Sequence, residues 1–241
     1  MRVAIVSDIH GNLVALEAVI ADLDREAPDL IVHGGDLSVI GPRPAEVIDL
    51  IREKGWPGVL GNTDELIVDA STRAEQERRA PKLRDWLEVL YDTLGPWARS
   101  RLRDEQFRWL AGLPREWRSQ ELVLLHAARA DLWRAPTQEA SDDELRATYG
   151  DLYARLAVYG HIHRPFVRQL DGLTVANSGS VGLPYDGDWR PSYLLIDEGI
   201  PVVRRVEYDL ERAHLEEIET GFPLAGWLSE VQHEGRFHRP G

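Results

Sequence analysis

The stretch that decides the fold is Val3–Asn12, which reads VAIVSDIHGN. Its first four residues are apolar and mostly β-branched, a pattern typical of a buried parallel strand. Asp8 and His10 follow at once, and a glycine and an asparagine then turn the chain toward a helix. Because open α/β sheets bind ligands beyond the carboxyl ends of their strands, this Asp-x-His pair is predicted to face a binding crevice.

The composition favours one globular domain over residues 1–241. The formal net charge is 28 − 41 = −13, so the surface repels a phosphate backbone and nucleic acid is not expected as a partner. The chain has no cysteine, which excludes disulfides and thiolate metal sites. With no recognisable signal peptide or membrane-spanning run, we expect a cytoplasmic protein without a membrane partner. The sequence does not indicate an oligomeric state.

The same arrangement of a strand followed by polar side chains recurs along the chain. A second expected strand, Leu30–Val32, runs into Asp36 through two glycines, which allow close backbone approach. A third, Trp56–Leu60, runs into Asn62. Three successive strand ends of this kind indicate a built site.

Two later strands extend the series. Residues 122–125 end in His126, and residues 156–159 are followed by His161 and His163. The candidate metal ligands are therefore seven oxygen- or nitrogen-bearing side chains: Asp8, His10, Asp36, Asn62, His126, His161 and His163. A set without sulfur suits manganese, iron, nickel or zinc. Seven ligands are too many for one ion and suit two ions that share one carboxylate.

The remaining segments supply helices and a β-rich end. Residues 66–118 have helical spacing and no strand signal, so they form either a helical insertion that caps the site or a helical layer that packs on the sheet. Other helices are expected at 13–26, 43–54 and 141–154, helices or loops at 209–219 and 223–233, and strands at 165–169, 173–176, 193–197 and 201–207. Residues from Gly235 onward are expected to fray.

The motifs resemble a known family. Asp8-Ile9-His10, Gly35-Asp36, Gly61–Asp64, His126 and Gly160–His163 are similar to the five signature motifs of the calcineurin-like metallophosphoesterases. The opening SDIHGN run and the NSGSVG run at 177–182 resemble the small bacterial and archaeal phosphodiesterase branch. The resemblance covers nearly the whole chain, and it is weakest over 66–118 and the C-terminal tail.

This resemblance implies a fold and a mechanism. The fold would be an α/β four-layer αββα sandwich of two mixed sheets flanked by helices. One divalent ion would be held by Asp8, His10, Asp36 and His163, and the other by Asp36, Asn62, His126 and His161. Manganese is favoured over iron, nickel or zinc.

The expected activity is hydrolysis of a small phosphodiester or an activated phosphomonoester, with diesters favoured. A hydroxide that bridges the two ions beside Asp36 would attack the phosphorus, and paired ions both generate such a nucleophile and clamp the phosphate. Asp36, Asn62 and His126 are the residues expected to take part in catalysis.

Three further residues are candidates for binding the substrate. Thr63 stands where many relatives carry a histidine that assists the leaving group; a threonine can bond a phosphate oxygen but cannot act as a general acid near pH 7. Arg129 can reach a substrate phosphate or form a surface ion pair. Asn12 can contact the phosphate or cap the following helix.

Two other functions compete with this one. A nuclease of the same fold is disfavoured by the net charge of −13 and by the lack of a basic stripe with interleaved aromatic residues. A non-catalytic metal-binding scaffold is disfavoured because all seven ligand positions carry competent side chains. The physiological substrate is not indicated, because substrate choice depends on loops that the pattern does not place.

Overall fold

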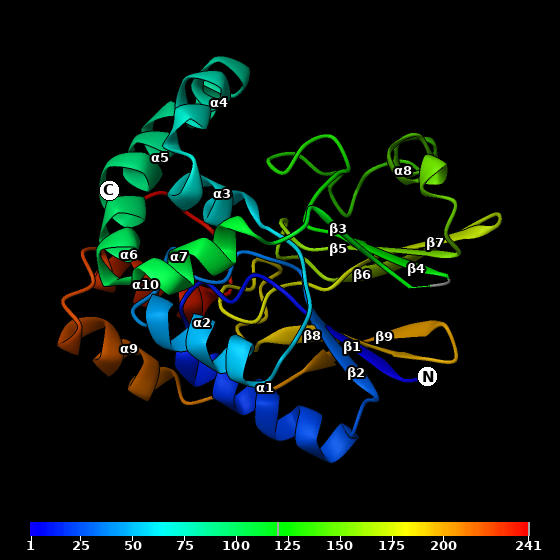
Figure 1. Cartoon of the computed structure of the whole chain (residues 1–241), viewed down its shortest axis with the longest axis horizontal. Coiled ribbons are helices and arrows are strands. Elements are labelled where there is room, and N and C mark those ends of the chain that lie inside the picture. The colour runs from blue at the N-terminus through cyan, green and yellow to red at the C-terminus, as the bar shows by residue number, and fades with distance from the viewer. Residues whose placement is uncertain (120, 241) are drawn as a thin grey trace.

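Two mixed sheets form the centre of the molecule in the computed structural model, which describes residues 1–119 and 121–240 (Figure 1). The first sheet has the strand order β2 (Leu30–His33), β1 (Val3–Val6), β8 (Ser192–Asp197) and β9 (Ile200–Arg205). β1 and β2 are parallel, and the other neighbours are antiparallel.

The second sheet has the order β3 (Glu116–Arg118), β4 (Leu122–Leu125), β5 (Leu156–Tyr159), β7 (Leu173–Asn177) and β6 (Phe166–Leu170). Its three central strands are parallel, and both edge strands pair antiparallel. β1 and β2 in one sheet and β4 and β5 in the other are parallel pairs, so the ligand-bearing strands of each sheet end on one side.

Alternation along β1 separates two cores. Val3 and Ile5 pack between the sheets with Leu124 and Val158, whereas Ala4 and Val6 face the helices on the other side. This is the period-two pattern of a strand buried on both faces. A third cluster, from the outer face of the second sheet, packs on α8 (Asp142–Tyr149). The expected αββα layering is confirmed.

Helices cover the outer face of the first sheet. They are α1 (Leu13–Glu26), α2 (Pro44–Glu53), α9 (Leu210–Glu219) and α10 (Ala225–Glu234) (Figure 1). α1 presents an apolar stripe to the sheet and begins at Asn12, whose side-chain Oδ1 accepts the Ala15 N–H at 3.0 Å.

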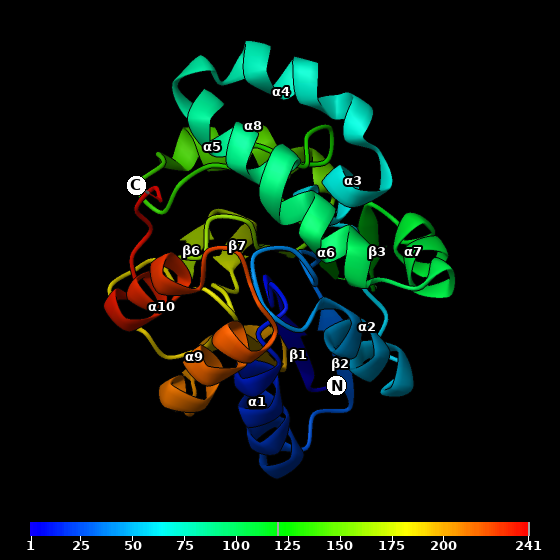
Figure 2. The same ribbon diagram turned by 90° about the vertical axis from the view of Figure 1, so that its left-hand side faces the viewer.

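The helical insertion is confirmed and forms an arc above the sheets (Figure 2). Its helices are α3 (Asn62–Val68), α4 (Arg73–Arg79), α5 (Arg84–Val89), a π-helical turn (Leu90–Leu94), α6 (Gly95–Arg101) and α7 (Asp104–Ala111). The expected range 66–118 extends too far at its end, because Glu116–Arg118 is β3 and pairs with β4. A three-residue edge strand has too few positions to show a period of its own, so the pairing with β4 defines it.

The third expected strand, Trp56–Leu60, is wrong as a strand. Only Gly58 forms a bridge, opposite His33. Pro57 has no N–H to give to a ladder, although its carbonyl accepts the His33 N–H at 2.9 Å. The segment still runs beside β2 and delivers Asn62 to the same edge.

One further helix ends earlier than expected. The helix expected over 141–154 ends at Tyr149 and continues as a 3₁₀ turn over Gly150–Leu152. In the described part of the C-terminal tail, residues 235–240, Phe237 contacts the rings of Trp86 and Tyr185 at centroid distances of 5.1 and 5.5 Å. Gly241, which also belongs to the segment expected to fray, lies outside the described residues. Among the described residues, no helix is long and apolar enough to cross a membrane.

Candidate metal centre

The strand ends bring the seven predicted ligands to one edge. Asp8 and His10 follow β1, Asp36 follows β2, and Asn62 opens α3. The remaining three follow the parallel strands of the second sheet: His126 after β4, and His161 and His163 after β5. The crevice therefore lies where the two sheets meet at the carboxyl ends of their strands, as expected for an α/β fold.

One group of side chains that could hold a cation consists of Asp8, His10 and His163. The Nε2 atom of His163 lies 3.2 Å from Asp8 Oδ1 and 3.2 Å from His10 Nε2. All three side chains are at most 5% exposed. The group has the nitrogen and oxygen donors of the first predicted ion.

A second group consists of Asp8, Asp36 and His126. Asp36 Oδ1 lies 3.6 Å from His126 Nε2, and Asp36 Oδ2 lies 3.7 Å from His10 Nε2. Asp36 is thus placed between the two groups, as a shared ligand must be. Asp8 belongs to both groups, although the sequence places it with the first ion alone.

Asn62 and His161 lie beside the second group. Asn62 Oδ1 lies 2.8 Å from His126 Nε2 and 2.8 Å from His161 Nδ1. These three atoms come from three different loops, so their convergence is a property of the fold and not of any local segment.

The outer nitrogen of each imidazole is held by a main-chain carbonyl. These bonds join His10 Nδ1 to Val39 O, His126 Nδ1 to Gly34 O, His161 Nε2 to Trp133 O and His163 Nδ1 to Leu183 O, at 2.6–3.1 Å. A carbonyl only accepts, so each of these nitrogens carries the proton and the other one presents a lone pair to the centre.

The facing lone pairs are the test of whether these residues fit metal ions. With these tautomers, the Nε2 atoms of His10 and His163 lie 3.2 Å apart with no proton between them. Two acceptors at that distance repel unless a cation lies between them or beside them. The donor set of imidazoles, carboxylates and an amide oxygen therefore fits divalent cations of borderline hardness.

The backbone at the ligands is unusual. Five of the seven candidate ligands have φ angles in the left-handed region: Asp8 (55°), His10 (52°), Asp36 (54°), His161 (66°) and His163 (56°). Such angles are uncommon outside glycine and concentrate at functional sites. The sequence gives no sign of this feature, because the residues are not glycine.

Two glycines leave space for the carboxylates. A Cβ on Gly61 would lie 2.0 Å from Asp36 Oδ1, and a Cβ on Gly160 would lie 2.4 Å from Asp8 Oδ2. The main-chain N–H groups of the same loops bind these carboxylates: His161 donates to Asp8 Oδ2 at 3.0 Å, and Thr63 donates to Asp36 Oδ1 at 2.9 Å. Close backbone approach thus fixes both acids.

Burial sets the protonation of the ligands. It raises the pKa values of Asp8 and Asp36 to about 6 each and lowers the pKa values of His10 and His163 to about 3 and 4. The His10 and His163 imidazoles are therefore neutral at physiological pH, which is the form that binds metal. The positive charge that the protein places near the carboxylates of Asp8 and Asp36 does not offset the effect of their burial.

Asp64 supports the centre without entering it. Its Oδ1 accepts the Leu37 N–H at 3.1 Å and its Oδ2 accepts the Gly61 N–H at 3.3 Å. Burial, followed by the nearby charge of Asp36, raises the pKa of Asp64 to about 7. The carboxylate links the loop after β2 to the loop that carries Asn62.

A cavity of about 570 Å³ opens on the metal ligands. Its floor contains His10, Asp36, Asn62, His161 and His163 together with Thr63. Most of the remaining lining is apolar: Ile40, Leu83, Trp86, Leu87, Leu90, Trp133, Ile162, Tyr185 and Phe237. Four of these residues come from the helical segment 83–90, so the insertion forms one wall of the cavity.

The three predicted substrate-binding residues have different positions. Thr63 lines the cavity, and its buried Oγ1 has no hydrogen-bond partner among the described residues. Asn12 uses Oδ1 to cap α1 and Nδ2 to bond Gly182 O, so it fits the capping alternative. Arg129 forms an ion pair with Glu116 at 3.0 Å and is not part of the cavity lining, so it fits the surface-pair alternative.

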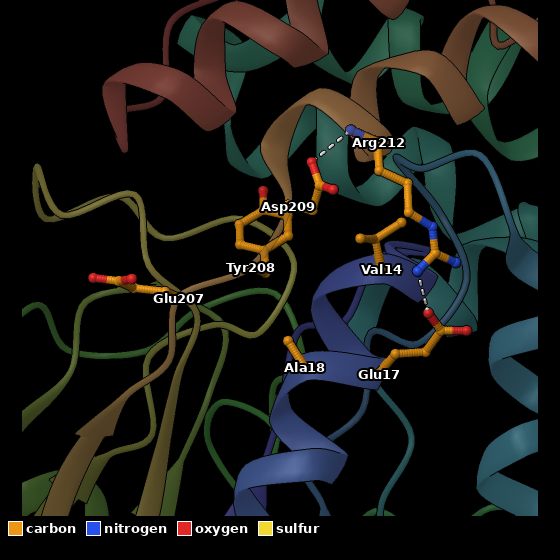
Figure 3. A pocket seen from close by; sticks show the side chains of 7 residues that line it. All are labelled: Val14, Glu17, Ala18, Glu207, Tyr208, Asp209 and Arg212. Carbon is orange, nitrogen blue, oxygen red and sulfur yellow. Dashed lines mark hydrogen bonds and ion pairs between the residues drawn. The ribbon is translucent and has the colours of Figure 1, made fainter.

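Sequence reasoning missed two wall residues, Trp133 and Phe237. Each lies in a segment without regular periodicity, so no pattern marks it as facing a cavity. A second hollow, of about 390 Å³, lies between α1 and the start of α9 (Figure 3). An ion pair between Arg212 and Glu17 crosses it at 2.7 Å, and its lining contains none of the candidate ligands.

Comparison with known proteins shows which family the sequence matches. Residues 1–199 match the family profile described as "Calcineurin-like phosphoesterase superfamily domain". The chain is 28% identical to the "Uncharacterized protein MJ0912" of Methanocaldococcus jannaschii, over 97% of this chain and 98% of that protein. It is 28% identical, over 72% of this chain and 60% of the relative, to a symmetrical bis(5'-nucleosyl)-tetraphosphatase of Pectobacterium carotovorum.

The fold is also shared with a solved structure. A metallophosphoesterase from Sphaerobacter thermophilus superimposes with a TM-score of 0.80 at 25% identity, covering 98% of this chain and all of that one. The similarity includes the strand ends that carry the candidate ligands, because it spans nearly the whole chain.

Proposed function

Because the chain belongs to the calcineurin-like phosphoesterase superfamily, we propose that it is a two-metal phosphoesterase that hydrolyses small phosphodiesters in preference to phosphomonoesters. The observation that carries the proposal is the set of four convergent imidazoles, of which His10, His126 and His163 are buried and His161 is partly buried. Each one is fixed by a main-chain carbonyl. The free nitrogens of His10, His126 and His163 face the carboxylates of Asp8 and Asp36, and that of His161 faces Asn62 Oδ1.

The ligands divide between two sites. One ion would be held by Asp8, His10, Asp36 and His163, and the other by Asp36, Asn62, His126 and His161, with manganese favoured for both. When bound, such ions supply an activated water near neutral pH and neutralise charge on the phosphate.

The protein's own groups position the ester. Thr63 has a hydroxyl at the cavity floor with no partner of its own, and we assign it a hydrogen bond to a phosphate oxygen. The floor offers no histidine at this position, so the preferred esters are those whose leaving group departs without strong acid assistance.

The charge of the cavity supports the diester preference. Arg164 is the only Lys or Arg among the described residues that line it, and its Nε donates to Tyr185 O at 3.1 Å. A diester carries one negative charge, whereas a monoester carries up to two and gains more from a cluster of cations. The same scarcity of basic groups disfavours a nuclease, which needs a basic groove along a strand.

The experiment is a paired assay. Chelator-stripped protein receives Mn²⁺, and release of p-nitrophenol is followed from bis-p-nitrophenyl phosphate and from p-nitrophenyl phosphate. We expect turnover only with metal, and a higher kcat/KM for the diester. Tight binding of two metals with no turnover of either ester would favour the scaffold, and faster turnover of the monoester would reverse the proposed preference.

A further inference from the structure

The cavity has two chemically different halves. Its floor is the candidate metal centre, and its walls are built mainly from side chains that are not candidate ligands: those of residues 83–90 of the insertion, Trp133 in the loop after β4, Tyr185, and Phe237 in the C-terminal tail. Four aromatic side chains stand in these walls: Trp86, Trp133, Tyr185 and Phe237. We refer to these four residues as the aromatic wall.

Trp133 is held in one orientation. Its indole Nε1–H donates to Glu65 Oε2 at 2.8 Å, and its ring stacks on Tyr91 at a centroid distance of 6.1 Å and an interplanar angle of 12°. The Glu65 carboxylate is itself paired with Arg115. A ligand that meets this indole therefore does not have to order it, which lowers the entropic cost of binding.

The other side of the wall is a packed aromatic group. Trp86 contacts Trp227 at 5.4 Å and Phe237 at 5.1 Å, between ring centroids. Phe237 also contacts Tyr185, whose ring stacks on the candidate ligand His163 at 4.3 Å. The tail is tied to the insertion by Arg239, which donates to Lys82 O and faces Asp85. Trp86, Phe237 and Tyr185 thus form a continuous aromatic group that extends from the insertion to the candidate ligand His163.

This lining favours one class of ester group. A lining of aromatic side chains with few polar atoms gains from contact with a flat apolar group, through burial and aromatic interactions. It offers little to a further phosphate, since Arg164 is the only basic side chain in the described lining beyond the floor. The volume of about 570 Å³ accommodates one such group beside a phosphate.

We propose that the aromatic wall selects phosphate esters that carry a flat aromatic group, either an aryl ring or a nucleobase, and seats that group against Trp86 and Trp133 while the phosphate lies on the metal centre. This inference rests on the proposed phosphoesterase function and specifies the substrate class of that same site.

The first test holds the leaving group constant. We compare kcat/KM for bis-p-nitrophenyl phosphate and methyl p-nitrophenyl phosphate, each divided by its Mn²⁺-promoted rate in solution. Stacking of one ring against aromatic side chains predicts a preference of about 5- to 100-fold for the aryl ester. Thymidine 5′-p-nitrophenyl phosphate is the third substrate: preference for it over the methyl ester identifies the base as an occupant, and preference for the aryl ester alone identifies an aryl ring.

Matched variants locate the effect. Trp86→Ala is expected to reduce the aryl-to-methyl ratio of kcat/KM toward one. Trp97→Ala is the control, because Trp97 lies in the same insertion but packs on Phe222 and is absent from the cavity lining. Phe237→Ala supplies a second wall variant if Trp86→Ala does not fold.

Binding provides a readout that does not depend on turnover. Phenylphosphonate and methylphosphonate are not hydrolysed, and calorimetry on Mn²⁺-loaded protein gives their Kd values. We expect tighter binding of phenylphosphonate, by about 5- to 100-fold, and loss of the difference in Trp86→Ala.

The outcomes separate this inference from the proposed function. Equal Kd values for the two phosphonates, or equal corrected kcat/KM values for all three esters, would overturn the aromatic selection. No turnover of any ester, together with a clear phenylphosphonate preference, would overturn the phosphoesterase and leave the aromatic site in place.

Discussion

The floor and the aromatic wall of one cavity are held in different ways. On the floor, Asp8, His10 and Asp36 are at most 2% exposed and are fixed by main-chain hydrogen bonds from neighbouring loops. In the walls, the contacts are between side chains, and Leu83 is 43% exposed. The floor is therefore rigid by backbone geometry, whereas the walls depend on packing that substitution can change without moving the ligands.

This contrast assigns separate tasks to the two regions. The ends of parallel strands supply the chemistry, and the insertion and the tail supply the choice of substrate. Substitutions on the floor should abolish turnover of all esters, and substitutions in the walls should change the ratio between esters. The predictions below run from the largest expected effect to the smallest.

Asp36→Asn is expected to produce the largest loss. Asp36 lies between the two ligand groups, 3.7 Å from His10 Nε2 and 3.6 Å from His126 Nε2, and an amide removes a negative charge that both ions need. We expect kcat/KM to fall by more than about 100-fold, beyond the usual cost of losing an outer hydrogen-bond partner. The drop should be equal for aryl and methyl esters.

The control for Asp36→Asn is Asp143→Asn, which removes an exposed carboxylate in the first turn of α8. Its kinetics should match those of the parent protein. Activity of Asp36→Asn within a few-fold of the parent would refute the shared-carboxylate assignment.

Asp64→Asn is expected to have an intermediate effect. The amide NH₂ group would face either the Leu37 N–H or the Gly61 N–H, because the carboxylate accepts from both. The loop that carries Asn62 should then shift, and metal affinity should fall by roughly 10- to 100-fold. Titration of the stripped protein with Mn²⁺ measures this, and added Mn²⁺ should restore most of the activity.

For Asp64→Asn, circular dichroism establishes that the fold is kept. If the fold and the Mn²⁺ affinity both equal those of the parent, Asp64 does not position the centre.

Glu217→Gln tests how the burial of a carboxyl group outside the cavity lining makes stability depend on pH. Burial raises the pKa of Glu217 to about 8, and its Oε2 lies 3.4 Å from His214 Nδ1. Since the folded-state value lies above the unfolded value near 4.5, the folded protein retains this proton at intermediate pH. The protonated Glu217 carboxyl therefore makes its whole contribution to stability below pH 4.5, and this contribution is lost as the pH rises from about 4.5 to 8.

The substitution should therefore raise the melting temperature at pH 8 by several degrees and change it little at pH 5. Metal-dependent turnover at pH 7 should be unchanged. An equal shift at both pH values would show that the carboxyl does not titrate as described.

The sequence predicts the floor better than the walls, for a physical reason. Strand ends such as those before Asp8 and His161 carry their ligands at fixed offsets from apolar runs, so both the strands and the clustering of the ligands follow from the pattern. The resemblance of the motifs then identifies the family, and the αββα layering is confirmed.

The residues that line the cavity walls follow no such pattern in the sequence. Trp133 and Phe237 reach the cavity through tertiary packing of irregular segments, and Glu116–Arg118 becomes a strand only because β4 lies beside it. The left-handed backbone at five ligands is likewise invisible in the sequence, because closure of the loops imposes it on aspartate and histidine. Pro57 weakens the third strand to a single bridge, yet Asn62 still lies at the expected edge, beside His126 and His161.

The most direct test of the account is the number of metal ions bound per chain. Stripped protein is titrated with Mn²⁺ by calorimetry, and metal content is measured after gel filtration. We predict two ions per chain for the parent protein, and a loss of tight binding at both positions in Asp36→Asn. A single ion in the parent, or two ions retained with equal affinity in the variant, would contradict a two-metal centre built around Asp36.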